Sequence, residues 1–473
     1  MARNGSRALT ALAATLAAGA CGDSAGTSDG QGGAAATTAA TSSTGGPGST
    51  TSGAGTGGSA LEAFTATFES RTFHCELVQD ATLEDPAENQ LQTRFNLTGT
   101  DLGIPAVLGD TLYLFFGDTV GYREIWPFGE DPDSVARVPL SAVVTDPTEV
   151  CRSLEFAVTP DIPSVANDTN PAILRDFAGA FLTPPSGEPI ESYVAQPAGP
   201  FPNMPGTFEV PGGALASGGK IYVFYAGLAE LAPTVRMTKS YLAAWDDPLG
   251  FVPGYRILRT IDELDPSGPL AGRFIQIAPA LHDGFVYLFG TGEYRRSGVH
   301  LARVPVTGLE DGAGTEVFDP SSASFVAPGT EVAPIFESEG VGEISVAYVE
   351  AANAWVALYQ RELHDGGGNI TDNRVVLRVA AKPEGPWTDV VTVVDMADPA
   401  FQAAHCCGAT CPGDQILHCD RAGLYGANLL PAVTVTPGAA PGSATLEVPF
   451  LASTWDPYGV VLFSTRVAIA PAG

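Results

Sequence analysis

Residues 104–118 read IPAVLGDTLYLFFGD: an apolar segment, a tight polar turn at Gly109-Asp110, and a second apolar segment with Tyr113 near its centre. Runs of this kind, rich in Val, Tyr and Phe and interrupted by Gly or Pro, are typical of strands joined by a hairpin turn. The arrangement returns, in full or in part, in four later stretches: GALASGGKIYVFYAG (213–227), PALHDGFVYLFGTGE (279–293), ISVAYVEAANAWVALYQ (344–360) and, as its second half alone, STWDPYGVVLFST (453–465). These copies predict an all-β protein built from repeated hairpins.

Aromatic residues set the register of the repeat. Tyr113, Tyr222, Tyr287 and Trp355 mark the same position in four copies, at steps of 109, 65 and 68 residues. A unit of this length is longer than the usual propeller blade of about 40–50 residues, but it accommodates four strands with long loops. The larger first step places an insertion near residues 120–205. Five units that close radially predict a five-bladed β-propeller, and a pair of β-sandwiches is the alternative.

The first 21 residues have the features of an export signal. Arg3 and Arg7 precede the apolar run 8–20, and Cys21 follows the small residues Ala-Gly-Ala. A basic start, a short apolar run and a small-residue cleavage site are typical of secretory signals. We therefore predict a lipoprotein-type signal peptide over residues 1–21 with Cys21 as the acylation site, and plain secretion is the alternative.

The segment after the signal has a composition of its own. Residues 22–60 are almost entirely Gly, Ala, Ser and Thr. Such a segment cannot bury enough apolar surface to offset its ordering entropy, so it is predicted to be a disordered linker. Residues 61–473 then form the propeller domain. We expect this domain outside the cell or on the outer-membrane surface, attached to a membrane only by an N-terminal lipid.

The composition is strongly acidic. With 23 Lys and Arg against 53 Asp and Glu, the formal net charge is −30. Such a chain repels phosphate backbones, so nucleic acid is not expected as a partner. A neutral polysaccharide fits this charge, although solubility outside the cell would also explain it. We expect a monomer that needs no cofactor.

Six of the seven cysteines lie beyond the predicted acylation site. They are Cys75, Cys151, Cys406, Cys407, Cys411 and Cys419. An even number in an exported chain favours disulfides. The segment HCCGATCPGDQILHC (405–419) also spaces Cys and His as a metal site could. Zinc sites usually have paired Cys-x₂₋₄-Cys ligands, which the adjacent Cys406 and Cys407 match poorly, so disulfides are favoured and no metal is predicted.

Two acids frame the first hairpin. If Gly109-Asp110 is a two-residue turn, then Leu108 faces Thr111, and Asp101 directly faces Asp118. Opposed like charges are destabilising, so one carboxyl keeps its proton or a cation lies between them. A protonated and an ionised carboxyl about 5–5.5 Å apart are what a retaining glycoside hydrolase uses. The purely structural alternative is a strand-entry acid at Asp101 and an Asx-turn at Asp118.

Aligned copies place further polar groups at the same end of the repeat. Glu343 corresponds to Asp101 in the fourth copy, Gln276 and Glu293 bracket the third copy, and Glu209 precedes the second. The remaining candidates for substrate binding are Tyr294, Arg295, Tyr425, Trp455 and Tyr458. A ring of acids, amides and aromatic side chains around a channel suits a sugar. Each residue alone could instead be a solvated loop residue, and Trp455 in particular could pack between blades.

Four motifs carry a resemblance to a known family. They are TDLGIP (100–105), LYLFFGDT (112–119), LYG (424–426) and STWDPYGVVL (453–462). With them the chain, from about residue 90 to its end, resembles the family called domain of unknown function 4185, which includes the endo-D-arabinanases of glycoside hydrolase family 183. The resemblance implies a five-bladed propeller and catalysis by Asp101 and Asp118. We favour Asp101 as the nucleophile and Asp118 as the acid/base, although the assignment stays open. The Cys-rich segment 405–419 departs from the family pattern.

The expected activity follows from that resemblance and from the acid pair. It is retaining, endo-acting hydrolysis of D-arabinofuranosyl bonds in mycobacterial arabinogalactan and lipoarabinomannan by a surface-anchored enzyme. A non-catalytic glycan-binding propeller and a hydrolase of another furanoside polysaccharide are the alternatives. A sialidase is disfavoured, because the Ser-x-Asp-x-Gly-x-Thr-Trp repeats of those propellers are missing from the sequence.

Overall fold

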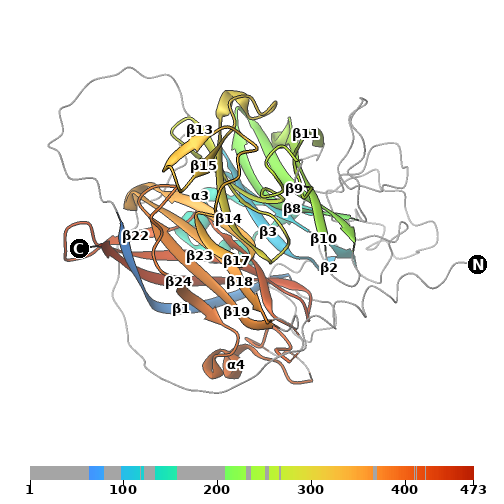
Figure 1. Ribbon diagram of the computed structural model, residues 1–473. Helices are drawn as coiled ribbons and strands as arrows, with labels where there is room; N and C mark the ends of the chain where they lie inside the picture. The colour runs from blue at the N-terminus through green and yellow to red at the C-terminus, as the bar shows by residue number, and fades with distance from the viewer. Residues whose placement is uncertain are drawn as a thin grey trace, which may run out of the picture.

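Strands make up nearly all the regular structure of this protein (Figure 1). The computed structural model describes residues 63–78, 97–117, 119–121, 134–156, 208–230, 236–250, 255–265, 268–365, 370–409, 411, 413–420 and 422–472. Within these ranges there are two short α-helices, α3 (Leu140–Thr145) and α4 (Pro399–His405). The all-β class predicted from the sequence is therefore confirmed. The predicted signal peptide, Cys21 and the linker lie outside the described residues.

The strands form five groups of about four strands, each in chain order or nearly so. Group 1 is β3 (Leu102–Leu108), β4 (Thr111–Phe116), β6 (Ser134–Pro139) and β7 (Glu155–Phe156). Group 2 is β8 (Phe208–Ser217), β9 (Lys220–Glu230), β10 (Arg236–Trp245) and β11 (Tyr255–Glu263). Group 3 is β12 (Gln276–His282), β13 (Phe285–Thr291), β14 (Ser297–Pro305), β15 (Glu316–Asp319) and β16 (Ser324–Val326). Group 4 is β17 (Phe336–Val349), β18 (Ala354–His364), β19 (Ile370–Ala380) and β20 (Val391–Asp395), and it joins group 3 where β14 pairs with β17.

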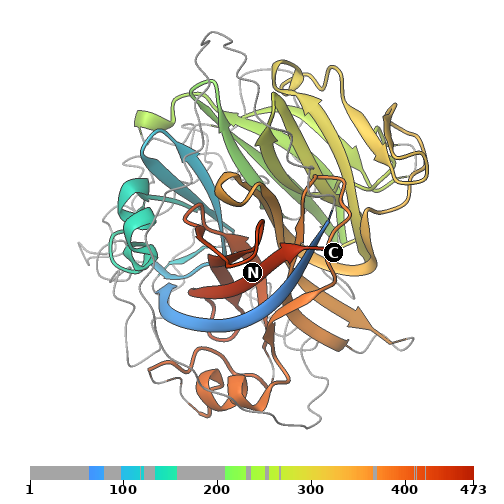
Figure 2. The same cartoon turned by 90° about the vertical axis from the view of Figure 1, so that its left-hand side faces the viewer.

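Group 5 combines the two ends of the described chain. Its order is β21 (Leu424–Leu429), β23 (Ala444–Thr454), β24 (Gly459–Pro471) and β1 (Phe64–Val78), with β22 (Thr434–Pro437) beside β23. Figure 2 shows β1, in blue, running along the red C-terminal strands. A separate short pair joins β2 (Leu97–Gly99) to β5 (Val120–Gly121). Four 3₁₀ turns complete the described elements: η1 (Pro147–Cys151), η2 (Pro248–Gly250), η3 (Val306–Gly308) and η4 (Glu350–Ala352).

The first strands of the five groups contact one another in a closed circuit. β3 contacts β8, β8 contacts β12, β12 contacts β17, β17 contacts β21, and β21 contacts β3 again. Asp101, Glu209, Gln276 and Tyr425 lie at the starts of four of these strands, and Glu343 lies within β17. The closed circuit therefore brings residues from all five groups toward one place.

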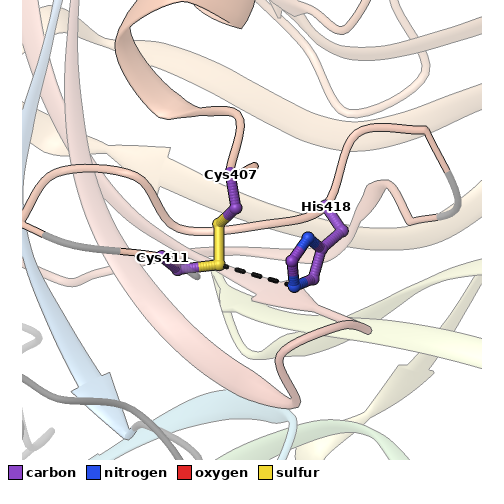
Figure 3. A group of neighbouring side chains, drawn as sticks. All are labelled: Cys407, Cys411 and His418. Atoms are coloured by element: carbon purple, nitrogen blue, oxygen red, sulfur yellow. Dashed lines mark hydrogen bonds between the residues drawn. A yellow bond between two sulfur atoms is a disulfide. The ribbon is translucent and has the colours of Figure 1, made fainter. Parts of the chain in front are cut away.

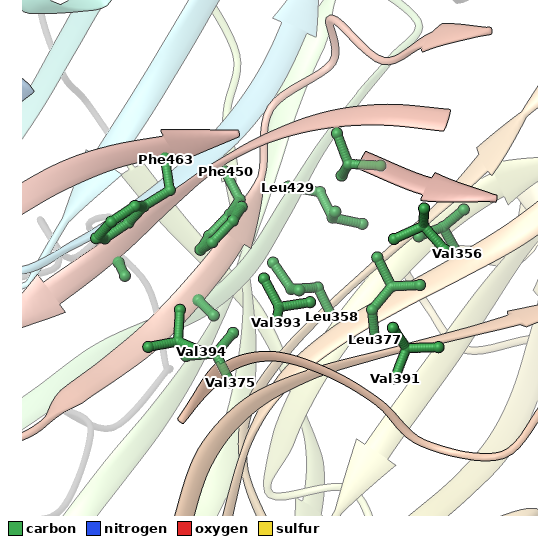
Figure 4. Packing of buried hydrophobic residues seen from close by; sticks show 14 of the residues in the cluster. Val356, Leu358, Val375, Leu377, Val391, Val393, Val394, Leu429, Phe450 and Phe463 are labelled. Carbon is green, nitrogen blue, oxygen red and sulfur yellow. The ribbon is translucent and has the colours of Figure 1, made fainter. Parts of the chain in front are cut away.

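Each neighbouring pair of groups encloses its own hydrophobic cluster. In β4, Tyr113 and Phe115 pack with group 2, whereas Leu112, Leu114 and Phe116 pack with group 5. A strand that is buried on both faces needs a continuous apolar run rather than an alternating one, which explains the sequence TLYLFF. Figure 4 shows the cluster between groups 4 and 5, and each large apolar side chain buried in this way contributes about 1.5–3 kcal/mol.

Four of the five predicted hairpins are confirmed and the fifth is placed differently. β3–β4, β8–β9, β12–β13 and β17–β18 are the first two strands of their groups. Residues 453–465 instead span the turn between β23 and β24, which are the second and third strands of group 5. The innermost strand of that group is β21, whose sequence LYGANL lacks the long apolar run of the other copies. The predicted insertion near 120–205 contributes β6 and β7 to group 1, and residues 157–207 lie outside the described part.

The ends of the described chain are fastened in two ways. β1 pairs with β24 from Phe64 opposite Pro471 to Val78 opposite Val460. A disulfide joins Cys75 in β1 to Cys151 at the end of η1. Together these contacts attach the first described strand to both group 5 and group 1. No helix in the described ranges is long and apolar enough to cross a membrane.

Candidate active site

Asp101 lies immediately before β3, and the register predicted for this hairpin does not extend to it. The pairs from Leu108–Thr111 to Ile104–Phe115 follow the predicted register, and then the register shifts by one residue at Gly103. Leu102 and Gly103 both have positive φ, +69° and +77°. As a result Gly117 lies opposite Asp101 and donates its backbone N–H to the Asp101 carbonyl at 3.1 Å. The predicted direct opposition of the two acids is wrong, because a β-bulge at Gly103 changes the phase of the hairpin.

Asp118 itself lies outside the described residues, but the residues on either side of it are described. The carbonyl oxygen of Gly117 accepts hydrogen bonds from the hydroxyls of Thr100 at 3.1 Å and Thr119 at 2.8 Å. Both threonine side chains are completely buried. Hydrogen bonds therefore connect Gly117 and Thr119, the two neighbours of Asp118, to Thr100.

The Asp101 carboxyl is buried, with 8% of the residue exposed. Tyr425 in β21 donates its hydroxyl to Oδ2 at 2.8 Å. Oδ1 has no hydrogen-bond partner among the described residues. A Cβ on Gly117 would overlap Oδ1, so only glycine leaves room for the carboxyl there.

Burial raises the pKa of Asp101 from its ordinary value to about 7. The hydrogen bond from Tyr425 and the nearby Tyr458 side chain lower this pKa, the negative charge of Glu343 raises it, and the positive charge of Arg295 lowers it. The Tyr425 hydroxyl stays protonated, because burial and the nearby Asp101 hold its own pKa well above the usual range. At neutral pH Asp101 is thus poised between its acid and its carboxylate form.

Arg295 joins two glutamates beside Asp101. Its guanidinium pairs with Glu343 in β17 at 3.1 Å and with Glu362 in β18 at 3.4 Å. The arginine lies over the rings of Tyr294, at 4.7 Å from the centroid, and Tyr425, at 5.5 Å. The Tyr294 hydroxyl donates to Glu343 at 3.1 Å. Burial lowers the pKa of Arg295, but the charge of Glu343 and its other neighbours outweigh that effect and raise the pKa well above its usual range.

Tyr458 and Trp455 belong to the turn between β23 and β24. Their rings meet edge to face, with centroids 5.6 Å apart. Tyr458 also lies near Asp101 and lowers the pKa of its carboxyl. Trp455 is 39% exposed, so the prediction that it could pack between blades is not confirmed.

The structure shows no side-chain contact between the other predicted binding residues and Asp101 among the described residues. Gln276 is buried at the start of β12 and lies opposite Thr291, not Glu293. Glu293 is exposed, two residues beyond the end of β13. Glu209 is paired through its backbone with Gly227 in β9, and its side chain lies outside the described residues.

Sequence analysis missed Glu362 and Gln360, which also belong to this cluster. Gln360 donates to Glu362 at 3.2 Å, and both residues are buried. They alternate with His364 along β18, in the sequence YQRELH at residues 359–364. Polar residues at every second position, Gln360, Glu362 and His364, were the available signal, because alternate residues of a strand share one face.

The predicted disulfides are confirmed in the Cys-rich segment. Cys406 bonds to Cys419 and Cys407 bonds to Cys411. Figure 3 shows the second disulfide with His418, whose Nε2 lies 3.8 Å from Cys411 Sγ. A metal would need thiolates, and both sulfurs near His418 are bonded to each other. The segment is a cross-linked loop.

Asp101 can exchange a proton in a buried environment. A carboxyl with a pKa near neutrality can donate a proton in one step and accept one in the next. The neighbouring Glu343 and Glu362 are neutralised in part by Arg295, which leaves the region slightly negative. Such a site suits a neutral substrate whose leaving group needs a proton.

Comparisons with known proteins agree with part of these expectations. The family described as "Domain of unknown function (DUF4185)" matches residues 209–464, which is more than half of the 473 residues. The match includes Arg295, Glu343 and Tyr425, whereas Asp101 and Asp118 precede it. The comparison with curated proteins gave no match.

Three solved structures are similar at low identity. A Bacteroides ovatus protein provisionally described as a hydrolase has a TM-score of 0.46 and 14% identity, over 80% of this chain and 88% of that chain. The Bacillus subtilis arabinanase Arb43A has a TM-score of 0.39 and 10% identity, over 78% and 96%. A Cellvibrio cellulosa α-L-arabinanase in complex with arabinohexaose has a TM-score of 0.37 and 13% identity, over 77% and 91%. At these values the similarity bears on neither the activity nor the substrate of this chain.

Proposed function

We propose that this chain, which belongs to the family described as domain of unknown function DUF4185, is a glycoside hydrolase that cleaves internal D-arabinofuranosyl bonds of arabinogalactan and lipoarabinomannan. We interpret the five strand groups as the blades of a five-bladed β-propeller. The substrate class comes from the resemblance of the motifs around Asp101 and Asp118 to glycoside hydrolase family 183. Asp101 supports the activity itself.

The single observation that carries the proposal is the buried carboxyl of Asp101 at the closed circuit of first strands. Its pKa of about 7 leaves a large fraction protonated at neutral pH. A general acid of this kind donates its proton to the glycosidic oxygen as the bond to the sugar breaks, and then accepts a proton from the attacking water. This argument favours Asp101 as the acid/base, in place of the nucleophile role favoured from the sequence.

We propose Asp118 as the second carboxylate. Gly117 and Thr119 on either side of it are hydrogen-bonded to Asp101 and Thr100, which supports a position near Asp101. Retention at the sugar carbon was expected from directly opposed acids, and the bulge at Gly103 removes that support. Retention therefore rests on the family resemblance alone. Identifying which anomer of the product forms first tests directly whether the configuration is retained.

The test uses the purified full chain with mycobacterial arabinogalactan. We expect release of short arabino-oligosaccharides, and loss of at least about 100-fold of the rate in Asp101→Asn and in Asp118→Asn. Asp283→Asn is the matched control, because Asp283 lies in the β12–β13 turn with φ +47°, where asparagine is well tolerated. Full activity in either active-site variant would remove the two-acid mechanism. Binding of the polysaccharide without any release would favour a glycan-binding protein, and release from another furanoside only would change the substrate.

The attachment of the enzyme is a second part of the proposal. We propose that Cys21 is acylated and that residues 22–60 tether a monomeric domain at the extracellular or outer-membrane surface. Both segments lie outside the described residues, so the support is the sequence pattern. Cys21→Ser should move the protein from the membrane fraction to the soluble fraction without changing its activity, and an unchanged membrane fraction would contradict acylation.

A further inference from the structure

Trp455 differs from the other tryptophans that the structure describes. It is 39% exposed, whereas Trp245 and Trp355 are 1% exposed, and Trp387 is only partly exposed. Single exposed aromatic residues are common on proteins, so exposure alone carries no function. What distinguishes Trp455 is its position, because the turn that holds it also holds a partner of Asp101.

Two contacts connect this indole to the proposed acid. The Trp455 ring meets the Tyr458 ring edge to face, with centroids 5.6 Å apart. Tyr458 in turn lies near Asp101 and lowers the pKa of its carboxyl. The backbone of Tyr458 is also packed against Gly99, where a Cβ would lie 2.8 Å from the Tyr458 carbonyl oxygen. An exposed aromatic face thus lies one side chain away from the proton donor.

The turn is held in shape by the Cys-rich segment. Within the turn, Thr454 donates its hydroxyl to the Pro457 carbonyl at 2.6 Å. From the segment, His418 donates its backbone N–H to the Asp456 carbonyl at 2.8 Å. His418 precedes Cys419, whose disulfide to Cys406 fixes this part of the segment to the end of α4.

The second disulfide stiffens the other side of the segment. Cys407 donates its backbone N–H to the Leu417 carbonyl at 2.7 Å and bonds covalently to Cys411. His418 lies beside that disulfide (Figure 3). A small loop with two cross-links and few free torsions is a rigid support. Rigid support lowers the ordering cost that a binding surface otherwise incurs when its ligand arrives.

We propose that Trp455 is a sugar-binding platform next to Asp101 and that the disulfide-bonded segment 405–419 holds it in the binding orientation. The proposal rests on the proposed function and deepens it. The ligand is a neutral oligosaccharide, because the apolar C–H face of a sugar ring packs on an indole and the acidic surroundings disfavour an anionic one. A substrate that extends from Asp101 to Trp455 occupies at least one sugar unit besides the pair at the cleaved bond.

The first experiment measures KM and kcat separately on arabinogalactan fragments. Trp455→Ala should raise KM at least about tenfold, which corresponds to about 1.4 kcal/mol, with kcat changed less than about threefold. Trp455→Phe should recover most of the loss, because it keeps an aromatic face. Phe68→Ala is the control, because Phe68 is an aromatic residue of similar exposure, 40%, on β1. An unchanged KM in Trp455→Ala would overturn the proposal while leaving the hydrolase proposal intact.

The second experiment measures binding without turnover. D-arabino-oligosaccharides added to the Asp101→Asn protein should change the tryptophan fluorescence, and the added Trp455→Phe substitution should abolish that change. A fluorescence change that survives Trp455→Phe would place the ligand elsewhere and overturn the proposal. If the wild-type protein hydrolyses no polysaccharide, the proposed function fails, whereas hydrolysis with no signal from Trp455 removes only the platform.

The third experiment tests the support. The double variant Cys407→Ser, Cys411→Ser should raise KM about threefold or more with little change in kcat, because the turn loses a rigid neighbour without losing a contact to the sugar. Thermal unfolding of the same protein checks that the domain stays folded. A folded variant with wild-type KM would show that Trp455 binds without help from the segment, and it would overturn that half of the proposal.

Discussion

The protonation of Asp101 is set by a few named side chains. Burial raises its pKa most strongly, and the hydrogen bond from Tyr425 and the nearby Tyr458 side chain oppose that effect. Sequence analysis selected Tyr425 as a sugar-stacking residue. In the structure its hydroxyl is committed to Asp101 at 2.8 Å. We infer that Tyr425 tunes and orients the acid.

Removal of that hydroxyl makes a prediction about pH. Tyr425→Phe deletes a hydrogen bond that favours the charged form of Asp101, so the pKa of Asp101 should rise above about 7, by about one unit. Because the protonated form is the proposed acid, the alkaline limb of the rate–pH profile should move to higher pH. Initial rates measured across the pH range test this. Tyr348→Phe is the control, because the Tyr348 hydroxyl bonds Asn353 in the β17–β18 turn. An alkaline limb that stays in place or moves to lower pH would contradict the assignment.

The sequence indicated which residues surround Asp101 but not which of them contact one another. Sequence analysis selected Asp101 from the hairpin register, Glu343 from the aligned copies, and Arg295 and Tyr425 as further binding candidates, and the structure brings these four together. The alignment could not show that Arg295 pairs with Glu362 as well as Glu343, because that contact depends on how neighbouring groups pack. It also gave Glu293 the same weight as Gln276, although one is exposed and the other buried.

At the scale of one element, the β3–β4 hairpin shows where sequence patterns stop being informative. The turn at Gly109-Asp110 and the pairs from Leu108 to Ile104 follow from turn chemistry. The shift at Gly103 does not, because a glycine in a strand permits a bulge without requiring one. Because of this one extra residue, Gly117 pairs with Asp101, and the predicted register fails at the position where the acid pair was expected.

The bulge makes Gly117 a sensitive position. Gly117→Ala would push a methyl group into Asp101 Oδ1 and place it 3.1 Å from Leu102 Cδ1. We expect a loss of about 1–3 kcal/mol in the free energy of unfolding, together with a large loss of activity as the carboxyl is displaced. Chemical denaturation and rate measurements on the same protein check both effects. Gly250→Ala is the control, because its new Cβ would make an ordinary contact, 3.5 Å from Asp247. A Gly117→Ala protein with wild-type stability and rate would show that the close packing is not required.

At the scale of the whole molecule, repetition was the informative signal. Four hairpin copies identified the first two strands of four groups, and the apolar run after each turn matched a strand that is buried on both faces over most of its described length. Group 5 was harder to predict because β21 is short and β1 comes from the far end of the sequence. The residues of β1, FTATFESRTFHCELV, repeat nothing else in the chain, so no internal comparison could assign them a partner.

The disulfide between Cys75 and Cys151 should contribute to the stability of the whole circuit. It joins residues 76 apart in sequence and ties β1 to η1 beside group 1. Cys75→Ser with Cys151→Ser should lower the free energy of unfolding by about 2–5 kcal/mol, because the unfolded chain regains a long loop. Chemical denaturation of the oxidised proteins measures it. The Cys407–Cys411 disulfide closes a loop of separation 4 only. The double variant Cys407→Ser, Cys411→Ser should therefore lose less free energy of unfolding. An equal or larger loss in that second variant would show that loop length does not govern the effect.

The pairing of β1 with β24 also constrains how the protein is made. Phe64 pairs with Pro471, so the chain must be synthesised as far as Pro471 before the earliest described strand can complete its pairing. Until then β1 has an unsatisfied edge of the kind that recruits foreign strands. β24 therefore covers one edge of β1 only after about 380 further residues have been made, and removal of Gly459–Pro471 would leave β1 without its native neighbour.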